Sequence, residues 1–215
     1  MKPGTQIKGH LITFEGIDFS GKSLQANLLK ENLQKKSVPV IFLREPGGTE
    51  ISEKIRGLLL DTKNQKMTAA TELLLYSAAR AQIVNECVIP HLKQGNEVIC
   101  DRYYDSTTAY QGFGRQLDLQ FIEQLNAFAT NHVVPDLTFL IDLKPETALR
   151  RKQNEKGMLD RLEQESLAFH HRVRQGYLEL AHQEGDRFVV VDGEQPVDSI
   201  QQLILDTAQS RLHLY

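Results

Sequence analysis

The stretch HLITFEGIDFSGKS, residues 10–23, decides the fold of this chain. Residues 10–15 are mostly apolar and predict a buried strand, whereas the residues from Lys22 onward (KSLQANLLKENL) predict a helix. The octapeptide at the junction matches the pattern G-x-x-x-x-G-K-[ST] in full: Gly16-Ile17-Asp18-Phe19-Ser20-Gly21-Lys22-Ser23. A strand, a glycine-rich turn and a helix in this order are the context in which that pattern binds phosphate.

The residue types of the octapeptide suit a polyphosphate ligand. Its glycines let consecutive backbone N–H groups turn toward phosphate oxygens, and the following helix adds the positive end of its dipole. Lys22 is expected to reach the β- and γ-phosphates, and the Ser23 hydroxyl to ligate Mg²⁺. All eight residues are therefore candidates for binding a nucleoside triphosphate. A glycine turn that contains Lys-Ser by coincidence is the alternative, and the flanking elements disfavour it.

Apolar runs and helical patterns alternate along the rest of the chain. Further strands are predicted at residues 39–43, 97–101, 137–143 and 187–192, and helices at 22–36, 49–60, 69–93, 117–131, 145–153, 161–183 and 197–212. Nearly continuous apolar strands are typical of a parallel sheet covered on both faces. The alternation predicts an α/β fold of the P-loop NTPase type, an open parallel five-stranded sheet flanked by helices. No repeat or linker divides residues 1–215, so one domain is expected.

Composition and charge exclude several classes of protein. The chain has 25 Lys and Arg against 28 Asp and Glu, a net charge of −3, which disfavours general nucleic-acid binding. Its apolar runs are far shorter than the roughly 20 residues of a membrane span. The polar N-terminal residues do not resemble a secretory signal. Cys87 and Cys100, each in an apolar segment, indicate reduced thiols and a cytoplasmic protein. The charge balance and the short apolar runs together predict no nucleic-acid or membrane partner.

The end of the strand at residues 97–101 carries the next candidate residues. Asp101 and Arg102 follow one another at the edge where a parallel sheet presents its ligands. Asp101 could hold Mg²⁺ through water, and Arg102 could clamp the phosphate of a phosphoryl acceptor. An ordinary ion pair at a strand end is the alternative.

Two patterns could recognise a flat base. Glu72, Tyr76 and Arg80 recur every four residues in the helix predicted at residues 69–93, so an aromatic face stands one turn from a guanidinium. Thr107 and Gln111 would share a face, with Tyr110 close by, if their segment is helical. A core aromatic beside a surface ion pair, and a solvated helix start, are the respective alternatives.

Basic residues elsewhere could face anionic ligands. Arg56 lies in the helix predicted at residues 49–60, just after the loop Arg44–Thr49 that follows the second predicted strand. Arg150, Arg151 and Lys152, with Lys156 and a glycine after them, predict a short mobile lid at about residues 150–161. Closure of such a lid would exclude water and bring cations to the transferring group. A solvated charged face is the alternative for these segments.

Taken in order, six motifs resemble the thymidylate kinase family, P-loop kinases of nucleoside monophosphates, across nearly the whole chain. They are FEGxDxxGKS (14–23), REPGGT (44–49), LLxYSAAR (73–80), DRY (101–103), STTAYQG (106–112) and DRLEQES (160–166). The resemblance implies the reaction ATP + dTMP ⇌ ADP + dTDP with Mg²⁺, by direct in-line transfer without a phospho-enzyme. It also implies a homodimer.

The resemblance further implies individual roles at the acceptor. Tyr76 takes the place of the aromatic, usually Phe, that stacks on thymine; Arg80 would bond a thymine carbonyl, and Thr107 and Gln111 would read the rest of the base edge. For the sugar and phosphate, the implied residues are Asp18 at the 3′-hydroxyl, Tyr110 at the 2′ position, and Arg56 and Arg102 at the monophosphate.

Catalysis is assigned by the same resemblance to Lys22, Arg102, Arg151 and Lys152, and metal binding to Ser23 and Asp101. Phe19 is apolar where the family often has a basic residue, so the cation that meets the transferring phosphoryl group stays open. Two alternatives also stay open: a kinase for dUMP, dCMP or a deoxynucleoside, and a non-catalytic switch that responds to nucleotide.

Overall fold

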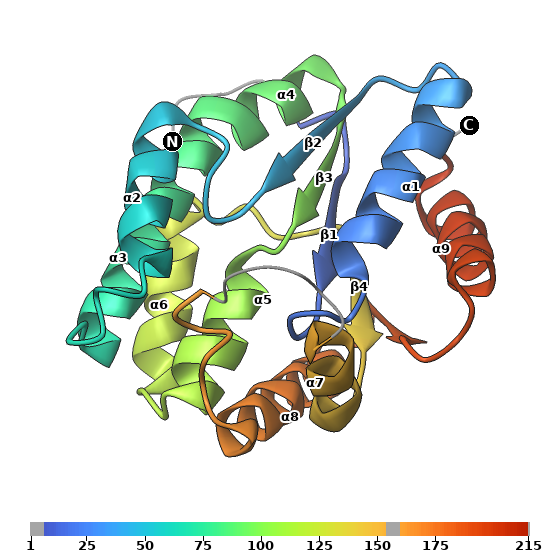
Figure 1. Cartoon of the computed structure of the whole chain (residues 1–215). Coiled ribbons are helices and arrows are strands. Elements are labelled where there is room, and N and C mark those ends of the chain that lie inside the picture. Colours follow the sequence, from blue (N-terminus) through green and yellow to red (C-terminus); the bar gives the residue numbers. More distant parts are fainter. Residues whose placement is uncertain (1–6, 154–159, 215) are drawn as a thin grey trace.

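The computed structural model of the chain describes residues 7–153 and 160–214 (Figure 1). Five parallel strands form one sheet in the order β2-β3-β1-β4-β5. Their bounds are β1 Leu11–Glu15, β2 Val40–Arg44, β3 Glu97–Asp101, β4 Leu137–Asp142 and β5 Phe188–Asp192. The predicted α/β class with an open parallel five-stranded sheet is thus confirmed, and each strand differs from its predicted range by no more than one residue at either end.

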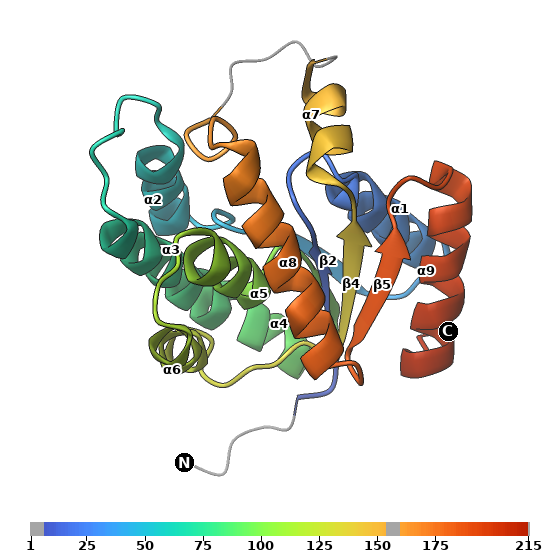
Figure 2. The same ribbon diagram turned by 90° about the horizontal axis from the view of Figure 1, so that it is seen from below.

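Helices cover both faces of the sheet (Figures 1 and 2). One face is covered by α1 (Lys22–Lys35) and α9 (Val197–Leu212). The other carries α3 (Ala69–Ile83), α4 (Ile89–Gln94), α5 (Tyr104–Thr107) and α8 (Leu167–Gln183), with α2 (Glu50–Leu60) and α6 (Leu119–Ala129) packed on α3. The remaining helix, α7 (Pro145–Gln153), follows β4 and packs on α8.

Alternate side chains of each strand enter different cores. Ile12, Phe14 and Phe139 point toward α1 and α9, and the rings of Phe14 and Phe139 lie 5.3 Å apart. Leu11 and Val98 enter the core on the opposite face. Because successive side chains of a strand project to opposite faces, both faces must be apolar when both are covered. This is why the strands read as continuous apolar runs in the sequence.

The helix predicted at residues 69–93 contains a wider turn. Its two α-helical parts, α3 and α4, are joined by the π-helical segment η1 (Val84–Val88), in which Ile89 N–H bonds to Val84 O. Pro90 has no N–H to give to the carbonyl four residues earlier, and its ring crowds that carbonyl. A widened turn accommodates the proline without ending the helix.

Two other segments differ from the sequence expectation. The helix predicted from residue 161 begins only at Leu167, where Ser166 Oγ accepts the Phe169 N–H at 3.2 Å and caps it. The segment after β3 is helical, as α5 followed by the π-helical segment η2 (Thr108–Gly114), with a bond from Arg115 N–H to Tyr110 O at 2.9 Å. The predicted lid at about residues 150–161 includes residues 154–159, which lie outside the described part of the chain.

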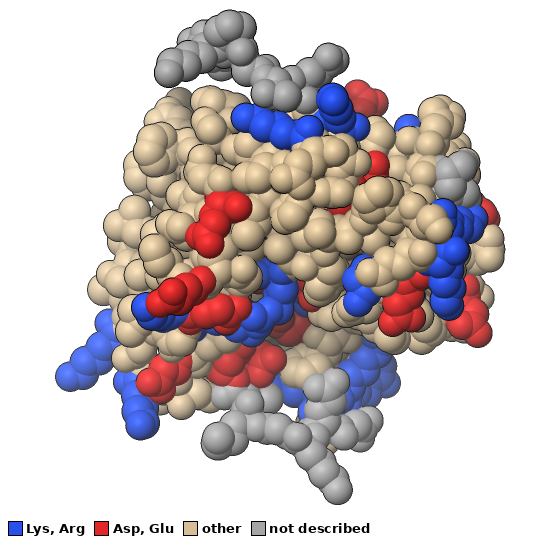
Figure 3. All heavy atoms as spheres, turned by 90° about the horizontal axis from the view of Figure 1, so that it is seen from above, with Lys and Arg blue, Asp and Glu red and all other residues tan. Residues whose placement is uncertain are grey.

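Two features of the surface bear on function. Within residues 7–153 and 160–214 the structure contains no helix with both the length and the apolar character that crossing a bilayer demands. Figure 3 shows the face seen from above Figure 1, where Lys and Arg side chains lie interspersed with Asp and Glu. The described residues on that face do not present one continuous basic surface.

Candidate active site

The phosphate loop connects the carboxyl end of β1 to the first turn of α1. Gly16 has φ 139°, and a Cβ placed there would lie 2.5 Å from Ile141 O, so only glycine fits. Gly21, with φ 97°, precedes the first residue of α1. Phe19 also adopts a positive φ, 63°, and packs against the apolar cluster formed with α7 and α8. The loop and the N-terminus of α1 together form a cradle for an anion.

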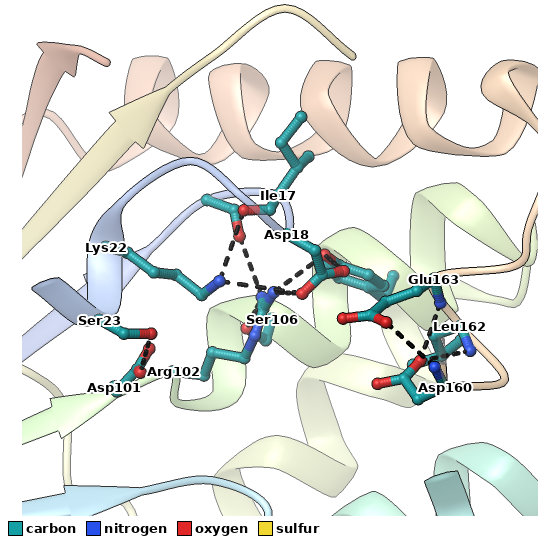
Figure 4. Close-up of polar contacts among 12 residues, drawn as sticks. Ile17, Asp18, Lys22, Ser23, Asp101, Arg102, Ser106, Asp160, Leu162 and Glu163 are labelled. Atoms are coloured by element: carbon teal, nitrogen blue, oxygen red, sulfur yellow. Dashed lines mark hydrogen bonds and ion pairs between the residues drawn. The ribbon is translucent and has the colours of Figure 1, made fainter. Parts of the chain in front are cut away.

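Lys22 lies in this cradle with its side chain almost wholly buried, at 7% exposure. Its Nζ donates to Ile17 O at 3.4 Å and lies 3.8 Å from Asp18 Oδ1 (Figure 4). Burial lowers the pKa of Lys22, and the positive charge of Arg102 lowers it further. The partners of Lys22 compensate only in part for the loss of hydration that burial imposes on its ammonium group. An anion beside Lys22 would therefore stabilise its charged form.

Ser23 and Asp101 meet beside the cradle. Ser23 Oγ donates to Asp101 Oδ2 at 2.5 Å, and Asp101 Oδ1 is buried without a hydrogen-bond partner in the described part of the chain. Two oxygen ligands with one carboxylate oxygen unsatisfied suit a hard cation such as Mg²⁺. The described residues contain no group of three His, Cys, Asp or Glu side chains placed to hold a metal. The predicted pair therefore fits a magnesium ion that takes its remaining ligands from phosphate and water.

Arg102 stands at the centre of the site. Its backbone is left-handed, with φ 72°, which directs the side chain from the end of β3 toward the phosphate loop. Nη2 donates to Asp18 Oδ1 at 2.6 Å and to Tyr110 Oη at 3.0 Å, and the Tyr110 hydroxyl in turn donates to Asp18 Oδ2 at 2.9 Å. Although desolvation opposes it, these contacts hold the pKa of Arg102 well above its ordinary value. Arg102, Asp18 and Tyr110 thus form one closed set of contacts.

Glu15 supports Arg102 from behind through two hydroxyl groups. Arg102 Nη1 donates to Ser106 Oγ at 3.1 Å and to Tyr177 Oη at 3.0 Å. Both hydroxyls donate onward to Glu15 Oε2, at 2.6 and 2.9 Å, while Tyr103 N–H donates to Glu15 Oε1 at 2.7 Å. Complete burial raises the pKa of Glu15 to about 7. Sequence reasoning did not assign Glu15 a role, although it stands immediately before the phosphate loop.

Arg80 is held by a second buried carboxylate. Its Nε donates to Glu45 Oε2 at 2.7 Å, Nη1 to Thr107 Oγ1 at 2.7 Å and Nη2 to Tyr103 O at 3.0 Å. Arg80 is 2% exposed, so the surface ion pair considered as an alternative is wrong. The guanidinium lies behind Thr107 and Glu45, which line the cavity, and is not itself part of the cavity wall.

One open cavity joins the phosphate loop to the base-reading candidates. Its wall includes Lys22 and Ser23 of the phosphate loop and α1, together with Tyr76 of α3 and Gln111 of η2. The other predicted residues in its wall are Asp18, Arg56, Asp101, Arg102, Thr107 and Tyr110. Polar residues in the wall without an assigned role are Arg44, Glu45, Ser106, Asp160 and Glu163. The structure therefore brings the predicted acceptor residues together, apart from Arg80, which stands one layer behind.

Two arginines lie at the edge of the cavity near the loop after β2. Arg56, half-buried, donates from Nη1 to Pro46 O at 3.0 Å, while Arg44 pairs with Glu53 at 2.9 Å. Burial lowers the pKa of Arg56, and the charge of Arg44 adds to this effect. Two guanidinium groups close enough to affect one another create a place where an anion is favoured. Arg44 is the first residue of the motif REPGGT, but sequence reasoning assigned it no role.

Arg151 and Lys152, the two predicted catalytic residues of the lid, lie away from this cavity. Arg151 donates to Phe19 O, Ser20 O and Gly193 O at 3.2, 3.1 and 2.7 Å, so it ties α7 to the phosphate loop. Lys152 Nζ donates to the carbonyl oxygen of Glu163. Neither side chain is part of the cavity wall. Lys156 lies outside the described residues, so the structure places only the base of the predicted lid.

A phosphate loop at the end of a central parallel strand, a carboxylate and an arginine on the adjacent strand, and an aromatic chamber opening from them define a P-loop kinase of small molecules. The thymidylate kinase family model matches residues 14–204. The chain belongs to the thymidylate kinase family.

Individual members of the family align with this chain over nearly its full length. The thymidylate kinase of Chlorobium chlorochromatii is 46% identical over 215 residues, covering 95% of this chain and 96% of the relative. That of Pelobacter propionicus is 49% identical over 211 residues, with coverage of 95% and 96%. The crystal structure of thymidylate kinase from Ehrlichia chaffeensis superposes with a TM-score of 0.76 at 34% identity, covering 94% of this chain and 98% of that one.

Proposed function

We propose that this chain transfers the γ-phosphoryl group of ATP to dTMP, giving ADP and dTDP, within the cavity between the phosphate loop and α3. The observation that carries the proposal is the continuity of this cavity, since Lys22 and Gln111 lie in the wall of the same space. Two anionic substrates bound from opposite ends would bring their phosphates together beside Arg102. Placing the reacting groups in this way is a large part of what phosphoryl transfer asks of a protein.

ATP binds through the residues Gly16 to Ser23, with Lys22 at the β- and γ-phosphates. Ser23 and Asp101 would hold Mg²⁺, whose chemistry is to neutralise charge on the phosphate oxygens. Asp101 Oδ1, buried and unpartnered among the described residues, supports this assignment. The chain itself contributes the fixed N–H groups of the loop and the N-terminus of α1.

The monophosphate of dTMP binds between Arg102 and Arg56. Arg102 is held on one side by the hydroxyls of Ser106 and Tyr177, so its guanidinium is already oriented when the anion arrives. An anion that approaches competes with Asp18 for the Nη2 hydrogens and stays close to Lys22. Direct in-line transfer then needs no phospho-enzyme, because the cations only have to offset charge.

The nucleoside occupies the far end of the cavity. Tyr76 offers its ring for stacking on thymine, while Thr107 and Gln111 face the base edge. Arg80 stands directly behind Thr107 and supplies positive charge toward a base carbonyl. Tyr110, whose hydroxyl is bonded to Asp18, limits the space at the 2′ position of the sugar, and Asp18 addresses the 3′-hydroxyl.

Arg151 and Lys152 are proposed to act when the lid closes. Each now donates to backbone carbonyl oxygens, so reaching a phosphoryl group means exchanging these partners for phosphate oxygens. An anionic acceptor is the stronger partner for a guanidinium.

A coupled assay of ADP release with dTMP tests the proposed function. We expect ADP release that depends on dTMP, and clearly lower rates with dUMP, dCMP and thymidine. Tight nucleotide binding without dTMP-dependent ADP release would indicate a nucleotide-dependent switch instead. A preference for unphosphorylated thymidine would contradict the acceptor role of Arg102 and Arg56.

The proposed assembly is a homodimer, and the proposed location is the cytoplasm. Apolar side chains are exposed on the neighbouring helices α2, α3 and α6: Leu58 (52%), Leu74 (54%), Phe121 (50%) and Phe128 (80%). Large apolar groups exposed on helices that pack against one another support pairing with a second chain. Cys87 and Cys100 are both free thiols, which suits a reducing compartment.

A further inference from the structure

The amide of Gln111 has a fixed orientation. Its Nε2 donates to Glu72 Oε1 at 2.8 Å, and Gln111 is 1% exposed. Glu72 does not line the cavity, whereas Gln111 does. Among the described residues the amide oxygen of Gln111 has no hydrogen-bond partner in the chain. With the nitrogen turned away toward Glu72, the oxygen is the atom left to face the cavity.

Glu72 can act only as an acceptor in this position. Arg115 donates to both of its oxygens, from Nε at 3.1 Å and Nη2 at 3.0 Å, and Arg161 Nη1 lies 2.5 Å from Oε2. Although burial opposes it, the hydrogen bonds and charges of these partners hold the pKa of Glu72 below its usual range. An ionised carboxylate has no hydrogen to donate, so a flipped Gln111 would set two oxygens against each other.

The orientation of this amide matters for the choice of base. Thymine and uracil carry an N–H at ring position 3, which an amide oxygen can accept. Cytosine has a bare ring nitrogen at that position, which would face the Gln111 oxygen with no hydrogen between them. A site built to bond one group rejects an analogue that lacks it, because buried polar atoms are then left unpaired.

We propose that Glu72 is a positioning residue for base selection: by accepting from Gln111 Nε2 it presents the Gln111 oxygen to the base and so favours an imide base over cytosine. This inference rests on the proposed function and adds to it. Glu72 itself does not touch the acceptor. The two buried carboxylates have parallel tasks, since Glu45 orients Arg80 and Glu72 orients Gln111.

The experiment compares kcat/KM for dTMP, dUMP and dCMP in four proteins: wild type, Glu72→Gln, Gln111→Leu and Glu165→Gln. Glu165 is the matched control, because it pairs with Arg115 at 2.6 Å in the same cluster, whereas the Gln111 amide donates to Glu72. Ratios between acceptors, measured on one preparation, are independent of the fraction of folded enzyme. The comparison therefore remains interpretable even if Glu72→Gln lowers the stability of the protein.

We expect Glu72→Gln to lower the dTMP-to-dCMP ratio of kcat/KM by about tenfold, since the Gln111 amide can then turn its N–H toward the ring nitrogen of cytosine. The dTMP-to-dUMP ratio should stay within about twofold of wild type, because both bases carry the same imide. Glu165→Gln should leave both ratios unchanged. Gln111→Leu should lower the dTMP-to-dCMP ratio as well.

Several results would overturn the inference. If Gln111→Leu lowers the dTMP-to-dCMP ratio and Glu72→Gln does not, the orientation of the amide does not depend on Glu72, and the proposed function stands. If Glu165→Gln acts as strongly as Glu72→Gln, the charge of the cluster and not the amide is responsible. If Gln111→Leu leaves the ratio unchanged, Gln111 does not read the base. Absence of dTMP phosphorylation by wild type would refute the proposed function itself.

Discussion

Arg102 Nη2 lies 2.6 Å from Asp18 Oδ1, so the arginine at the end of β3 and the carboxylate inside the phosphate loop form one ion pair. Asp18 also lies 3.8 Å from the ammonium of Lys22. Two cations that would otherwise repel one another are thus held together by a single carboxylate (Figure 4). The two cations proposed to act on the phosphates thus already lie close together in the chain itself.

Asp18→Asn should lower kcat/KM for dTMP by roughly 10- to 100-fold, the range expected when a charged hydrogen bond is lost. Without the carboxylate, Arg102 loses its partner at Nη2, and the 3′-hydroxyl of the sugar loses its proposed acceptor. Steady-state kinetics with each substrate varied in turn measures the effect. Asp198→Asn, an exposed change at the start of α9, should keep wild-type values. Equal kinetics for the two variants would contradict the role of Asp18.

Lys22→Ala should lower kcat by about 10²- to 10³-fold while the protein remains folded, as removal of one preorganised donor at a developing charge does. Circular dichroism and thermal unfolding confirm folding, and the ADP-release assay gives the rate. The control is Lys35→Ala in the last turn of the same helix, where the side chain is exposed. A folded Lys22→Ala protein with near-normal turnover would refute the assignment of the phosphate loop.

Glu15 gives a pH dependence to stability. Burial, with the nearby charge of Asp105, raises the pKa of Glu15 from 4.5 to about 7, so the folded protein retains a proton that the unfolded chain releases between these values. The free energy of unfolding therefore receives a contribution from Glu15 that falls as pH rises from 4.5 to about 7. The loss is on the order of a few kcal/mol.

Glu15→Gln removes this titration. We expect the difference in unfolding free energy, variant minus wild type, to become more positive between pH 5 and 8, measured by urea denaturation. Any constant effect of the amide on the contacts with Ser106 and Tyr177 cancels in this comparison. A difference that stays flat across the pH range would show that Glu15 is ionised throughout.

Phe128→Glu tests the proposed dimer face. Phe128 is 80% exposed on α6, and a carboxylate there should prevent an apolar contact between two chains. Analytical ultracentrifugation should give a dimer mass for wild type and a monomer mass for the variant. Leu203→Glu, on α9 at the opposite side of the sheet, is the control because its side chain is also exposed. A wild-type monomer, or a variant that still dimerises, would contradict the assignment.

Much of the architecture could be predicted because its causes are local. A strand buried on both faces reads as a continuous apolar run, and the phosphate loop is a fixed pattern in a fixed context, from Gly16 to Ser23. The placement of Asp101 beside Ser23 also follows from local facts, since parallel strands end at one edge. These features needed no knowledge of side-chain packing.

The remaining features depend on partners far apart in the chain. Glu15 meets Tyr177, 162 positions later, and Arg80 meets Glu45, 35 positions earlier. No periodicity records such pairs, so Arg80 reads as a surface cation until its buried partner is known. Arg151 likewise reads as a lid cation, although its guanidinium bonds three backbone carbonyl oxygens.

The wide turn of η2 (Thr108–Gly114) allows two successive side chains, Tyr110 and Gln111, to serve one chamber. In a tightly wound helix, neighbours diverge by about 100° around the axis, and a pair facing the same ligand is harder to build. Removing one residue here would restore ordinary winding and move the proposed sugar contact of Tyr110 away from the proposed base contact of Gln111. Among sequences that share this motif, the number of residues in the turn should therefore be as restricted as their identity.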